Sequence, residues 1–307
     1  MQPKIAISVG DLNGIGLELI LQNHKKISTL CQPIYCINEY MLNQSATLLN
    51  IKIPKDIKLY QTNGKFKIKP SKVSKFSGKY SFDSFSDAIK LCKSNKTQAL
   101  VTLPINKKSW EKAGINYVGH TDALRDIFKK DAIMMLGCKK LFVALYTEHI
   151  ALKDVPKQIK TKELTKFLLD FYSNIKSNNI GVLALNPHAS DDGVLGYEEI
   201  FINKAIKKAN KILKKDIFKG PLVPDIAFTP NTRKQYKYMV AMYHDQGLAP
   251  LKALYFDQSI NVSLNLPIIR TSVDHGTAFD IAYKNKQNLN SKSYINAIKE
   301  AIKLSKK

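Results

Sequence analysis

The sequence predicts an α/β protein with a mostly parallel sheet, and its pattern, length and composition support that prediction. Short β-rich runs alternate along the chain with longer amphipathic segments. This alternation favours a parallel sheet with helices on both faces. The length of 307 residues suits two such domains or one large one. A hydrophobic content of 44% excludes a mainly disordered chain and a small disulfide scaffold.

The expected elements follow in chain order. Strands are expected over residues 4–9, 32–37, 99–103, 132–136, 141–146, 180–185, 225–228, 238–242 and 260–264. Helices are expected over 15–27, 84–94, 122–129, 162–177, 198–213 and 293–303. The segment 162–177 shows the helical spacing of apolar residues most clearly. The polar, lysine-rich stretch 51–79 is expected to form a surface excursion.

The charge of the chain is strongly positive. Lysine and arginine number 48 against 25 acidic residues, which gives a net charge of +23. Such an excess can indicate a nucleic-acid-binding protein. However, the lysines spread over the whole chain, and arginine, which reads bases and phosphates best, is scarce. We therefore expect a solvated surface and no nucleic-acid partner. Each arginine becomes a candidate for a specific role: Arg125, Arg233 and Arg270.

Neither a membrane segment nor a disulfide framework is expected. No apolar run approaches the roughly 20 residues that span a bilayer. The start of the chain lacks the long apolar segment of a signal peptide, so we expect a cytoplasmic protein. The cysteines form no C-x-x-C pair and are expected to be reduced thiols: Cys31, Cys36, Cys92 and Cys138.

Three histidines each follow a strand-like apolar run. They are His149, His188 and His244. In open α/β sheets, ligands bind beyond the carboxyl ends of the strands. Three imidazoles with an open coordination position form a pattern typical of catalytic metal sites. The alternative is three separate loop histidines, because the sequence has no close-range metal motif such as H-E-x-x-H.

Two carboxylates are candidates beside these histidines. Asp245 directly follows His244, where it could orient the imidazole or act as a ligand itself. Asp225 opens the expected strand 225–228. The alternative for Asp225 is a surface residue at the end of a strand.

A further group of residues suits an anion. His120 and Thr121 precede an expected helix, so Thr121 is expected to cap it and leave N–H groups for an anion. The alternative is a cap with no ligand. Lys252, Asn261 and Arg270 would bind phosphate or carboxylate well if they converge. Lys252 alone is one of many lysines, whereas Arg270 stands at an expected strand end.

The segment 10–16, Gly-Asp-Leu-Asn-Gly-Ile-Gly, joins the first strand to the first helix. Its glycine spacing differs from the G-x-G-x-x-G dinucleotide motif. It is therefore expected to be a tight turn.

Four motifs in this order resemble one known family. They begin at Gly119 (GHTD), Asn186 (NPHA), Tyr243 (YHDQGL) and Leu266 (LPIIRTSVDHGTAFDIA). They are similar to the 4-hydroxythreonine-4-phosphate dehydrogenases of vitamin B6 biosynthesis, and the match runs from the first strand to the last helix. The resemblance implies an isocitrate/isopropylmalate dehydrogenase-like fold, with two α/β/α domains and an active site in the interdomain cleft. Residues 1–125 and 272–307 would form the terminal, cofactor-side domain. Residues 126–271 would form the middle domain, with the metal ligands and the interface of a homodimer.

The resemblance also implies roles for individual residues. His149, His188 and His244 would bind one divalent ion (zinc, magnesium or cobalt) in a site shared between subunits. The substrate-binding positions would be His120, Thr121, Lys252, Asn261 and Arg270. The positions near the adenosine of NAD or NADP would be Asp274, His275, Gly276, Thr277 and Ala278.

The implied reaction is the oxidation of 4-phosphooxy-L-threonine to 2-amino-3-oxo-4-phosphooxybutanoate. That product decarboxylates to 3-amino-2-oxopropyl phosphate, on the route to pyridoxal phosphate. The candidates for taking the hydroxyl proton are Asp225, Asp245 and Lys107. The nearest alternative is a paralogous metal-dependent dehydrogenase of another phosphorylated four-carbon acid, such as threonate 4-phosphate. A metal hydrolase without nicotinamide is another, against which the motif 274–282 argues.

The chain departs from the family pattern at a few positions. Tyr283 and Asn285 stand where relatives usually have glycine, as does Asn265, and Leu12 stands where relatives tend to have proline. These departures leave the metal and substrate positions intact. Tyr283 and Asn285 directly follow the motif that carries the cofactor-side residues.

Overall fold

The computed structural model describes residues 2–284 and 289–306, so Asn285 lies outside the described residues. The chain divides into two compact units. Unit 1 comprises Met1–Lys130 and Ile260–Lys307, and unit 2 comprises Asp131–Ser259. The boundaries expected from the sequence lie at 125/126 and 271/272. Residues 260–271 belong to unit 1 here, because the strands over 260–264 and 270–273 pair within its sheet.

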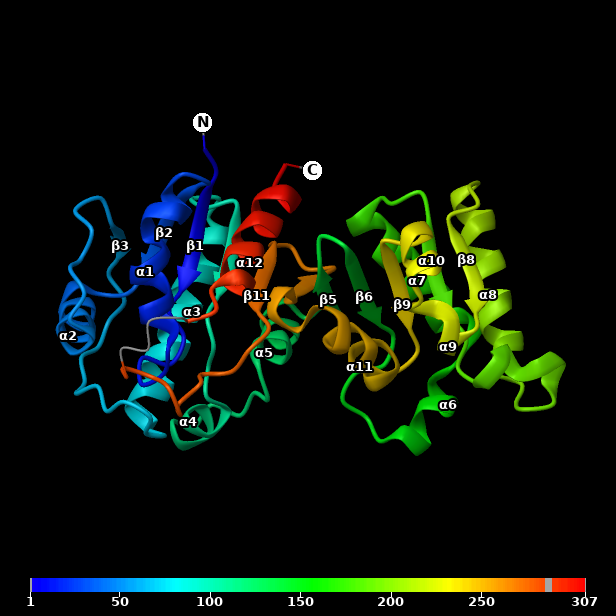
Figure 1. Ribbon diagram of the computed structural model, residues 1–307, viewed down its shortest axis with the longest axis horizontal. Helices are drawn as coiled ribbons and strands as arrows, with labels where there is room; N and C mark the ends of the chain where they lie inside the picture. The colour runs from blue at the N-terminus through cyan, green and yellow to red at the C-terminus, as the bar shows by residue number, and fades with distance from the viewer. Residues whose placement is uncertain (1, 285–288, 307) are drawn as a thin grey trace. The chain divides into compact units, whose positions relative to one another are not determined.

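Unit 1 contains a mostly parallel sheet (Figure 1). Its strands are β1 (Lys4–Ser8), β2 (Gln32–Cys36), β3 (Lys58–Tyr60), β4 (Ala99–Thr102), β10 (Ile260–Leu264) and β11 (Arg270–Val273). They lie in the order β3-β2-β1-β4-β11-β10. Only β10 runs antiparallel to its described neighbour, β11. The carboxyl ends of β1, β4 and β11 therefore lie at one edge, where ligands bind in such sheets.

Helices cover both faces of this sheet. They are α1 (Gly16–Ser28), α2 (Glu39–Leu49), α3 (Lys75–Lys93), α4 (Lys107–Lys112), α5 (His120–Phe128) and α12 (Lys292–Leu304). Neighbouring residues of a strand point to opposite faces. On β2, Tyr35 contacts His24 of α1 and Tyr294 of α12, whereas Cys36 packs in the cluster built around α3.

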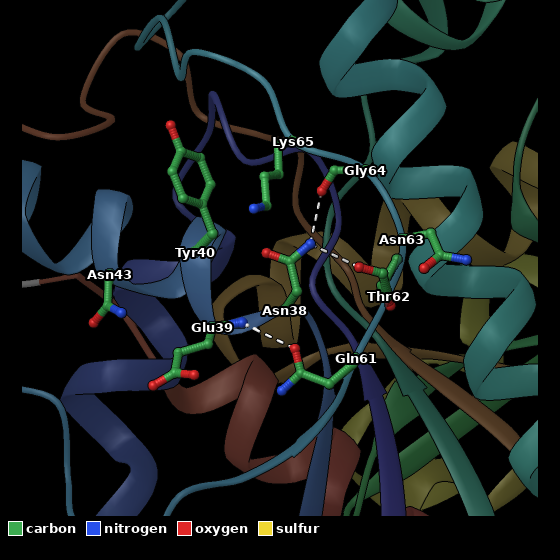
Figure 2. A pocket seen from close by; sticks show the side chains of 9 residues that line it. All are labelled: Asn38, Glu39, Tyr40, Asn43, Gln61, Thr62, Asn63, Gly64 and Lys65. Carbon is green, nitrogen blue, oxygen red and sulfur yellow. Dashed lines mark hydrogen bonds between the residues drawn. The ribbon is translucent and has the colours of Figure 1, made fainter.

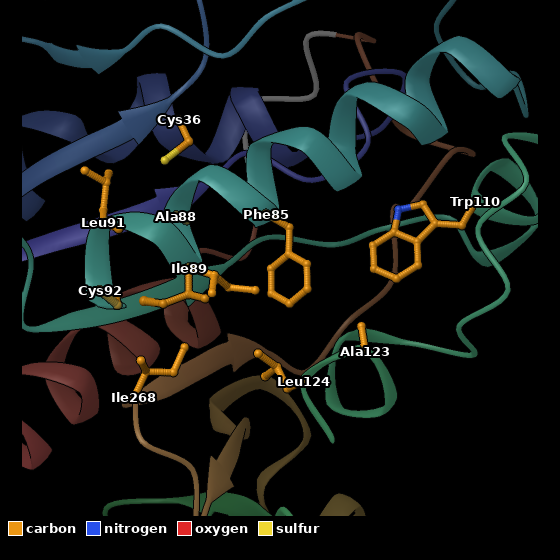
Figure 3. Packing of buried hydrophobic residues seen from close by; sticks show 12 residues of the cluster. Cys36, Phe85, Ala88, Ile89, Leu91, Cys92, Trp110, Ala123, Leu124 and Ile268 are labelled. Carbon is orange, nitrogen blue, oxygen red and sulfur yellow. The ribbon is translucent and has the colours of Figure 1, made fainter. Parts of the chain in front are cut away.

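The core under α3 is built from large side chains of three helices (Figure 3). Phe85 of α3, Trp110 of α4 and Leu124 of α5 are each fully buried. The indole N–H of Trp110 donates to Ser81 Oγ at 2.8 Å, so its polar atom is satisfied inside the core. This packing places the beginning of α5, and His120 with it, against the sheet.

Unit 2 also contains strands that pair mostly in parallel. Its strands are β5 (Ile133–Cys138), β6 (Leu141–Leu145), β7 (Ile180–Leu183), β8 (Phe218–Leu222) and β9 (Tyr238–Ala241), in the order β5-β6-β9-β7-β8. Only β5 runs antiparallel to its described neighbour, β6. On β6, Phe142 and its partner Tyr238 stack towards Phe171 of α7, whereas Val143 packs with Leu248 and Leu251 of α11.

The helical segments of unit 2 connect these strands. They are η1 (Leu152–Asp154), α6 (Val155–Gln158), α7 (Thr161–Ile175), η2 (Pro187–Gly193), α8 (Glu198–Leu213), α9 (Pro224–Ala227), α10 (Pro230–Gln235), α11 (His244–Tyr255) and η3 (Phe256–Gln258). The apolar stripe predicted over 162–177 is buried, with Leu164, Leu168 and Phe171 at its centre. No helix in the described parts of the chain is long and apolar enough to cross a membrane.

One predicted strand is wrong. Residues 225–228 were expected to be extended, but Asp225 lies in the short helix α9. Pro224 opens that helix at a position where its fixed φ fits and no N–H is needed. The strand of this region is β8, just upstream. The sequence pattern did not indicate β8, because this strand contains Gly220 and Pro221, and both residue types are unfavourable in strands.

Several other elements were missed or misplaced. The helices α2 and α11 were not expected, and α11 carries Pro250 inside it. α3 begins at Lys75, well before the expected 84, and β3 also lies within the expected surface excursion. Arg270 begins β11, whereas the sequence placed it at the end of a strand.

Candidate functional site

Arg270 is a buried cation in unit 1. Only 2% of it is exposed. Nε and Nη2 donate to Thr102 Oγ1 at 3.1 and 2.8 Å, and Nη1 donates to Ser263 Oγ at 3.1 Å and to Asn261 Oδ1 at 3.4 Å. All of these acceptors are neutral. Burial lowers the pKa of Arg270 to about 9, so the guanidinium still carries its charge at neutral pH. A buried charge without a carboxylate partner is costly, which makes an anion a fitting ligand.

His120 lies beside this arginine as a neutral imidazole. Its ring meets Phe85 and Trp110 edge-on, with centroids 4.7 and 5.5 Å apart. Burial, and then the charge of Arg270, hold the pKa of His120 well below its usual range. Its Nε2 is buried and has no hydrogen-bond partner among the described residues. A buried polar atom of this kind is available for a hydrogen bond to a ligand.

Four of the five predicted substrate positions converge in unit 1. Thr121 Oγ1 lies 3.2 Å from Ser263 Oγ, the same hydroxyl that accepts from Arg270. Asn261 contacts Arg270 directly, and His120 lies within its electrostatic reach. Thr121 does not cap α5, because that helix begins at His120 and its N-cap is Gly119. Thr121 instead contributes its hydroxyl from the first turn.

The remaining predicted polar residues are more exposed or lie in unit 2. Lys252 lies on α11 in unit 2, with Nζ 5.5 Å from the centre of the Phe256 ring. Asp225 is exposed on α9. Asp245 is 83% exposed and its Oδ1 lies 3.2 Å from His244 Nδ1. In unit 1, Lys107 is exposed as the first residue of α4.

The predicted metal ligands all lie in unit 2, beyond neighbouring strands. His149 follows β6, His244 follows β9, and their ring centroids lie 5.4 Å apart. His188 follows β7, which pairs with β9 in parallel, so it stands at the same sheet edge. Its side chain is exposed, and no cluster of three or more metal-ligating side chains occurs among the residues that the structure describes. The single chain thus brings two imidazoles together, a donor type that zinc and cobalt accept.

The loop before His188 is held by a buried carboxylate. Glu199 Oε1 accepts from the backbone N–H groups of Leu185 and Asn186 at 2.9 and 2.8 Å, and its Oε2 accepts from Asn186 Nδ2 at 2.9 Å. Charge-assisted hydrogen bonds of this kind are strong. Glu199 therefore fixes the backbone from which His188 projects.

The predicted cofactor-side residues follow β11 and pack on the first turn of unit 1. Thr277 O accepts from Ile15 N at 3.1 Å. A Cβ at Gly14 would lie 2.7 Å from Thr277 O, so this close approach requires glycine. Asp274 N donates to Ser293 Oγ at 3.0 Å at the other end of the segment. The predicted tight turn over 10–16 is confirmed, and it serves as a platform for residues 274–278.

A separate polar hollow of about 510 Å³ lies at the beginning of α2 (Figure 2). Asn38 Nδ2 donates to Thr62 O and to Gly64 O, both at 2.7 Å, and so ties its two walls together. None of the residues predicted from the sequence lines it. The lining residues are Asn38, Glu39, Tyr40, Asn43, Gln61, Thr62, Asn63, Gly64 and Lys65.

Sequence reasoning missed Thr102, Ser263 and Glu199. Ser263 had a usable signal, because it lies two residues after Asn261 on one strand and so shares its face. Thr102 stands at the end of an expected strand, but a lone threonine there carries no chemical signature. Nothing in the sequence separates Glu199 from its exposed neighbours on an amphipathic helix.

The family model of the pyridoxal phosphate biosynthetic protein PdxA matches residues 29–301. The chain belongs to this family. It is 62% identical over 301 residues to the 4-hydroxythreonine-4-phosphate dehydrogenase of Sulfurimonas denitrificans, covering 98% of this chain and 97% of that protein. It also resembles the crystal structure of that enzyme from Klebsiella pneumoniae, with a TM-score of 0.86, 29% identity, and 100% and 99% of the two chains covered.

The comparisons also confirm the predicted fold class. The isocitrate dehydrogenase of Methylococcus capsulatus matches with a TM-score of 0.50 and 12% identity, covering 99% of this chain and 88% of that one. At this identity the likeness concerns the fold alone. Membership of the family agrees with the resemblance that the four sequence motifs carry.

Proposed function

We propose that the protein oxidises 4-phosphooxy-L-threonine to 2-amino-3-oxo-4-phosphooxybutanoate, with NAD or NADP as acceptor. The relatives' names support the substrate. The observation that carries the proposal is the buried Arg270, whose described hydrogen bonds all go to neutral oxygens. Its guanidinium supplies the charge and planar donors that a substrate phosphate needs.

The residues of unit 1 bind and orient the substrate. Arg270 and Asn261 would hold the phosphate, with Lys252 of unit 2 as a further cation. Thr121 offers a hydroxyl, and the neutral His120 offers Nε2 as a donor or acceptor to a substrate oxygen. Because the pKa of His120 is lowered, its imidazole stays neutral and adds no charge beside Arg270.

The residues of unit 2 would hold the metal. His149, His188 and His244 are the proposed ligands, with Asp245 orienting His244. A divalent ion there would lower the pKa of the C3 hydroxyl. The bound nicotinamide would accept the hydride that leaves C3, held through the segment 274–278. Asp225, Asp245 and Lys107 remain the candidates for the hydroxyl proton. The β-keto acid then loses its carboxyl group as CO2, which gives 3-amino-2-oxopropyl phosphate.

We propose a homodimer in which each metal site is shared. Large apolar side chains are exposed just after His188: Val194 is 79% exposed, Tyr197 65% and Ile200 53%. Large apolar side chains exposed within one short segment favour an interface there. A second copy covering it would bring its own His188 region towards the pair formed by His149 and His244, with two equivalent sites per dimer.

The test is an oxidation assay followed through the absorbance of the reduced nicotinamide. The purified protein, a divalent ion, and NAD or NADP are supplied with 4-phosphooxy-L-threonine or with threonate 4-phosphate. Turnover of the first substrate supports the proposal, and exclusive turnover of the second would replace it with the paralogous activity. In Arg270→Lys the KM for the phosphorylated substrate should rise at least about tenfold, because the charge stays but the planar donors are lost. Arg233→Lys, which changes an arginine of unit 2, is the matched control.

A further inference from the structure

The cofactor-side segment, residues 274–283, ends in a residue with an unusual backbone. Tyr283 has φ of 59°, in the left-handed region that favours glycine. A tyrosine in this region is strained, because its Cβ crowds the following carbonyl oxygen. A strained residue persists when its surroundings hold it in place, and the contacts of Tyr283 show what holds it.

The Tyr283 phenol ties the segment to two other elements. Its hydroxyl donates to Leu12 O at 2.7 Å in the first turn. Since the phenol proton is used there, Ser45 Oγ of α2, 3.2 Å away, donates to the phenol oxygen. Burial raises the pKa of Tyr283, so the phenol keeps its proton at neutral pH.

The middle of the segment is anchored to the first turn and to its neighbour Ser71. Thr277 O accepts from Ile15 N, and Phe279 O accepts from Ser71 Oγ. Ser71 is itself fixed, because its N–H donates to Asn13 O at 2.9 Å. These contacts hold the middle of the segment. Tyr283 supplies the hydrogen bonds at its end, and the residues proposed to meet the cofactor lie between Tyr283 and β11.

We propose that Tyr283 is a positioning residue that fixes the segment 274–283 on the first turn and thereby sets the affinity for the nicotinamide dinucleotide. This inference rests on the proposed function. A segment already held in its binding geometry loses less conformational freedom when the ligand binds. The hydrogen bonds that hold Tyr283 in its strained conformation would therefore also favour binding of the dinucleotide.

The test compares Tyr283→Phe with the wild-type protein. Phenylalanine keeps the ring and removes the hydroxyl that bonds Leu12 and Ser45. The dissociation constants of NADH and NADPH are measured by fluorescence titration, without turnover. We expect a rise of roughly 3- to 10-fold for the preferred dinucleotide, the size expected for one or two lost hydrogen bonds. In the steady state the KM for the dinucleotide should rise while the KM for 4-phosphooxy-L-threonine stays unchanged.

The matched control is Tyr35→Phe, which removes another buried phenol hydroxyl of unit 1, one that bonds His24 away from this segment. It should leave the dinucleotide affinity unchanged. A second variant, Tyr283→Gly, restores the residue usual in the family and relieves the strain, but removes the phenol. Its dissociation constant should rise at least as much as in Tyr283→Phe.

Three results would overturn the inference. Wild-type affinity in both Tyr283 variants would show that the phenol does not set cofactor binding, while the proposed function would stand. An equal loss of affinity in Tyr35→Phe would show that removing another buried phenol hydroxyl of unit 1 weakens dinucleotide binding just as much. The effect of Tyr283→Phe would then be one of general destabilisation. Failure of the wild-type protein to bind either dinucleotide would remove the proposed function together with this inference.

Discussion

The two units present their candidate residues in opposite ways. In unit 1, Arg270, His120 and Thr121 are buried. Arg270 and Thr121 are joined through Ser263, and the charge of Arg270 acts on His120. In unit 2, His188 is exposed and stands apart from the pair formed by His149 and His244. The described chain thus gathers a buried polar cluster in unit 1, but in unit 2 it brings only two of the three imidazoles together. The comparison teaches that burial and shared hydrogen bonds fix the geometry of the first group, whereas nothing of that kind holds His188 beside the other two histidines of the described chain.

The largest expected effect is the loss of a metal ligand. His188→Ala should lower kcat at least about 100-fold and reduce the bound metal, measured by atomic emission after dialysis. Chelation of the wild-type protein should have the same effect, and zinc, cobalt or magnesium should restore activity. Full activity in His188→Ala would show that this histidine is not a metal ligand. The difference between the two units would then rest on His149 and His244 alone.

Mixing subunits tests the division of ligands directly. Because His149 and His244 lie together in one chain, His149→Ala and His244→Ala subunits should not complement each other. If His188 reaches the partner's pair, mixing His188→Ala with His244→Ala should restore about half the activity per mixed dimer, since one of its two sites is then intact. Mass spectrometry confirms that mixed dimers have formed. Recovery in the first mixture alone would reverse the assignment.

Removing Nε2 of His120, which has no hydrogen-bond partner among the described residues, should lower activity without lowering stability. His120→Phe keeps an aromatic ring against Phe85 and Trp110 but has no polar atom. The value of kcat/KM should fall about 10- to 100-fold, because a substrate oxygen loses its partner. The melting temperature should stay level or rise, since a buried unsatisfied atom is gone. A large fall in melting temperature would mean that the imidazole has a structural partner instead.

Phosphate alone should stabilise unit 1. At about 100 times its dissociation constant, a ligand adds about 2.7 kcal/mol of stability, which corresponds to a rise in melting temperature of roughly 5–10 °C for a unit of this size. Sulfate should act similarly, chloride should not, and Arg270→Lys should lose most of the effect. Calorimetry with and without phosphate measures it.

The smallest expected effect is a pH dependence of that stabilisation. The free protein loses the charge of Arg270 as the pH rises through its pKa of about 9, so anion affinity should weaken above that pH. Below it the charge of Arg270 is largely present, and the shift produced by sulfate, which does not titrate in this range, should be nearly constant between pH 7 and 8. Calorimetry at pH 7, 8 and 10 checks the trend. A shift unchanged at pH 10 would show that Arg270 keeps its proton in the free protein at that pH.

The sequence predicted the class of fold and four polar residues that lie together in unit 1, because both rest on local signals. Alternating strands and helices indicate an α/β fold, and Arg270 drew attention because arginine is scarce. The strand at 225–228 failed because a proline that begins a helix looks locally like one that ends a strand. The acceptor Thr102 could not be found, since its role arises from pairing β4 with a strand far along the chain. The order of the strands in the sheet likewise decides which of the three histidines lie close together. No local sequence pattern reveals that order.

The place of β11 in its sheet has a consequence for how the chain is made. β11 lies between β4 and β10, yet it is synthesised after the whole of unit 2. During translation, β1, β2 and β4 are synthesised early, and β4 lacks its neighbour β11 until residues 270–273 have been made. Unit 2 is continuous in sequence and is free to fold in the meantime. The hydrogen bonds between Arg270 and Thr102 therefore form only after residue 270 has been synthesised, so a nascent chain stalled before that point carries His149, His188 and His244 but lacks this buried cation.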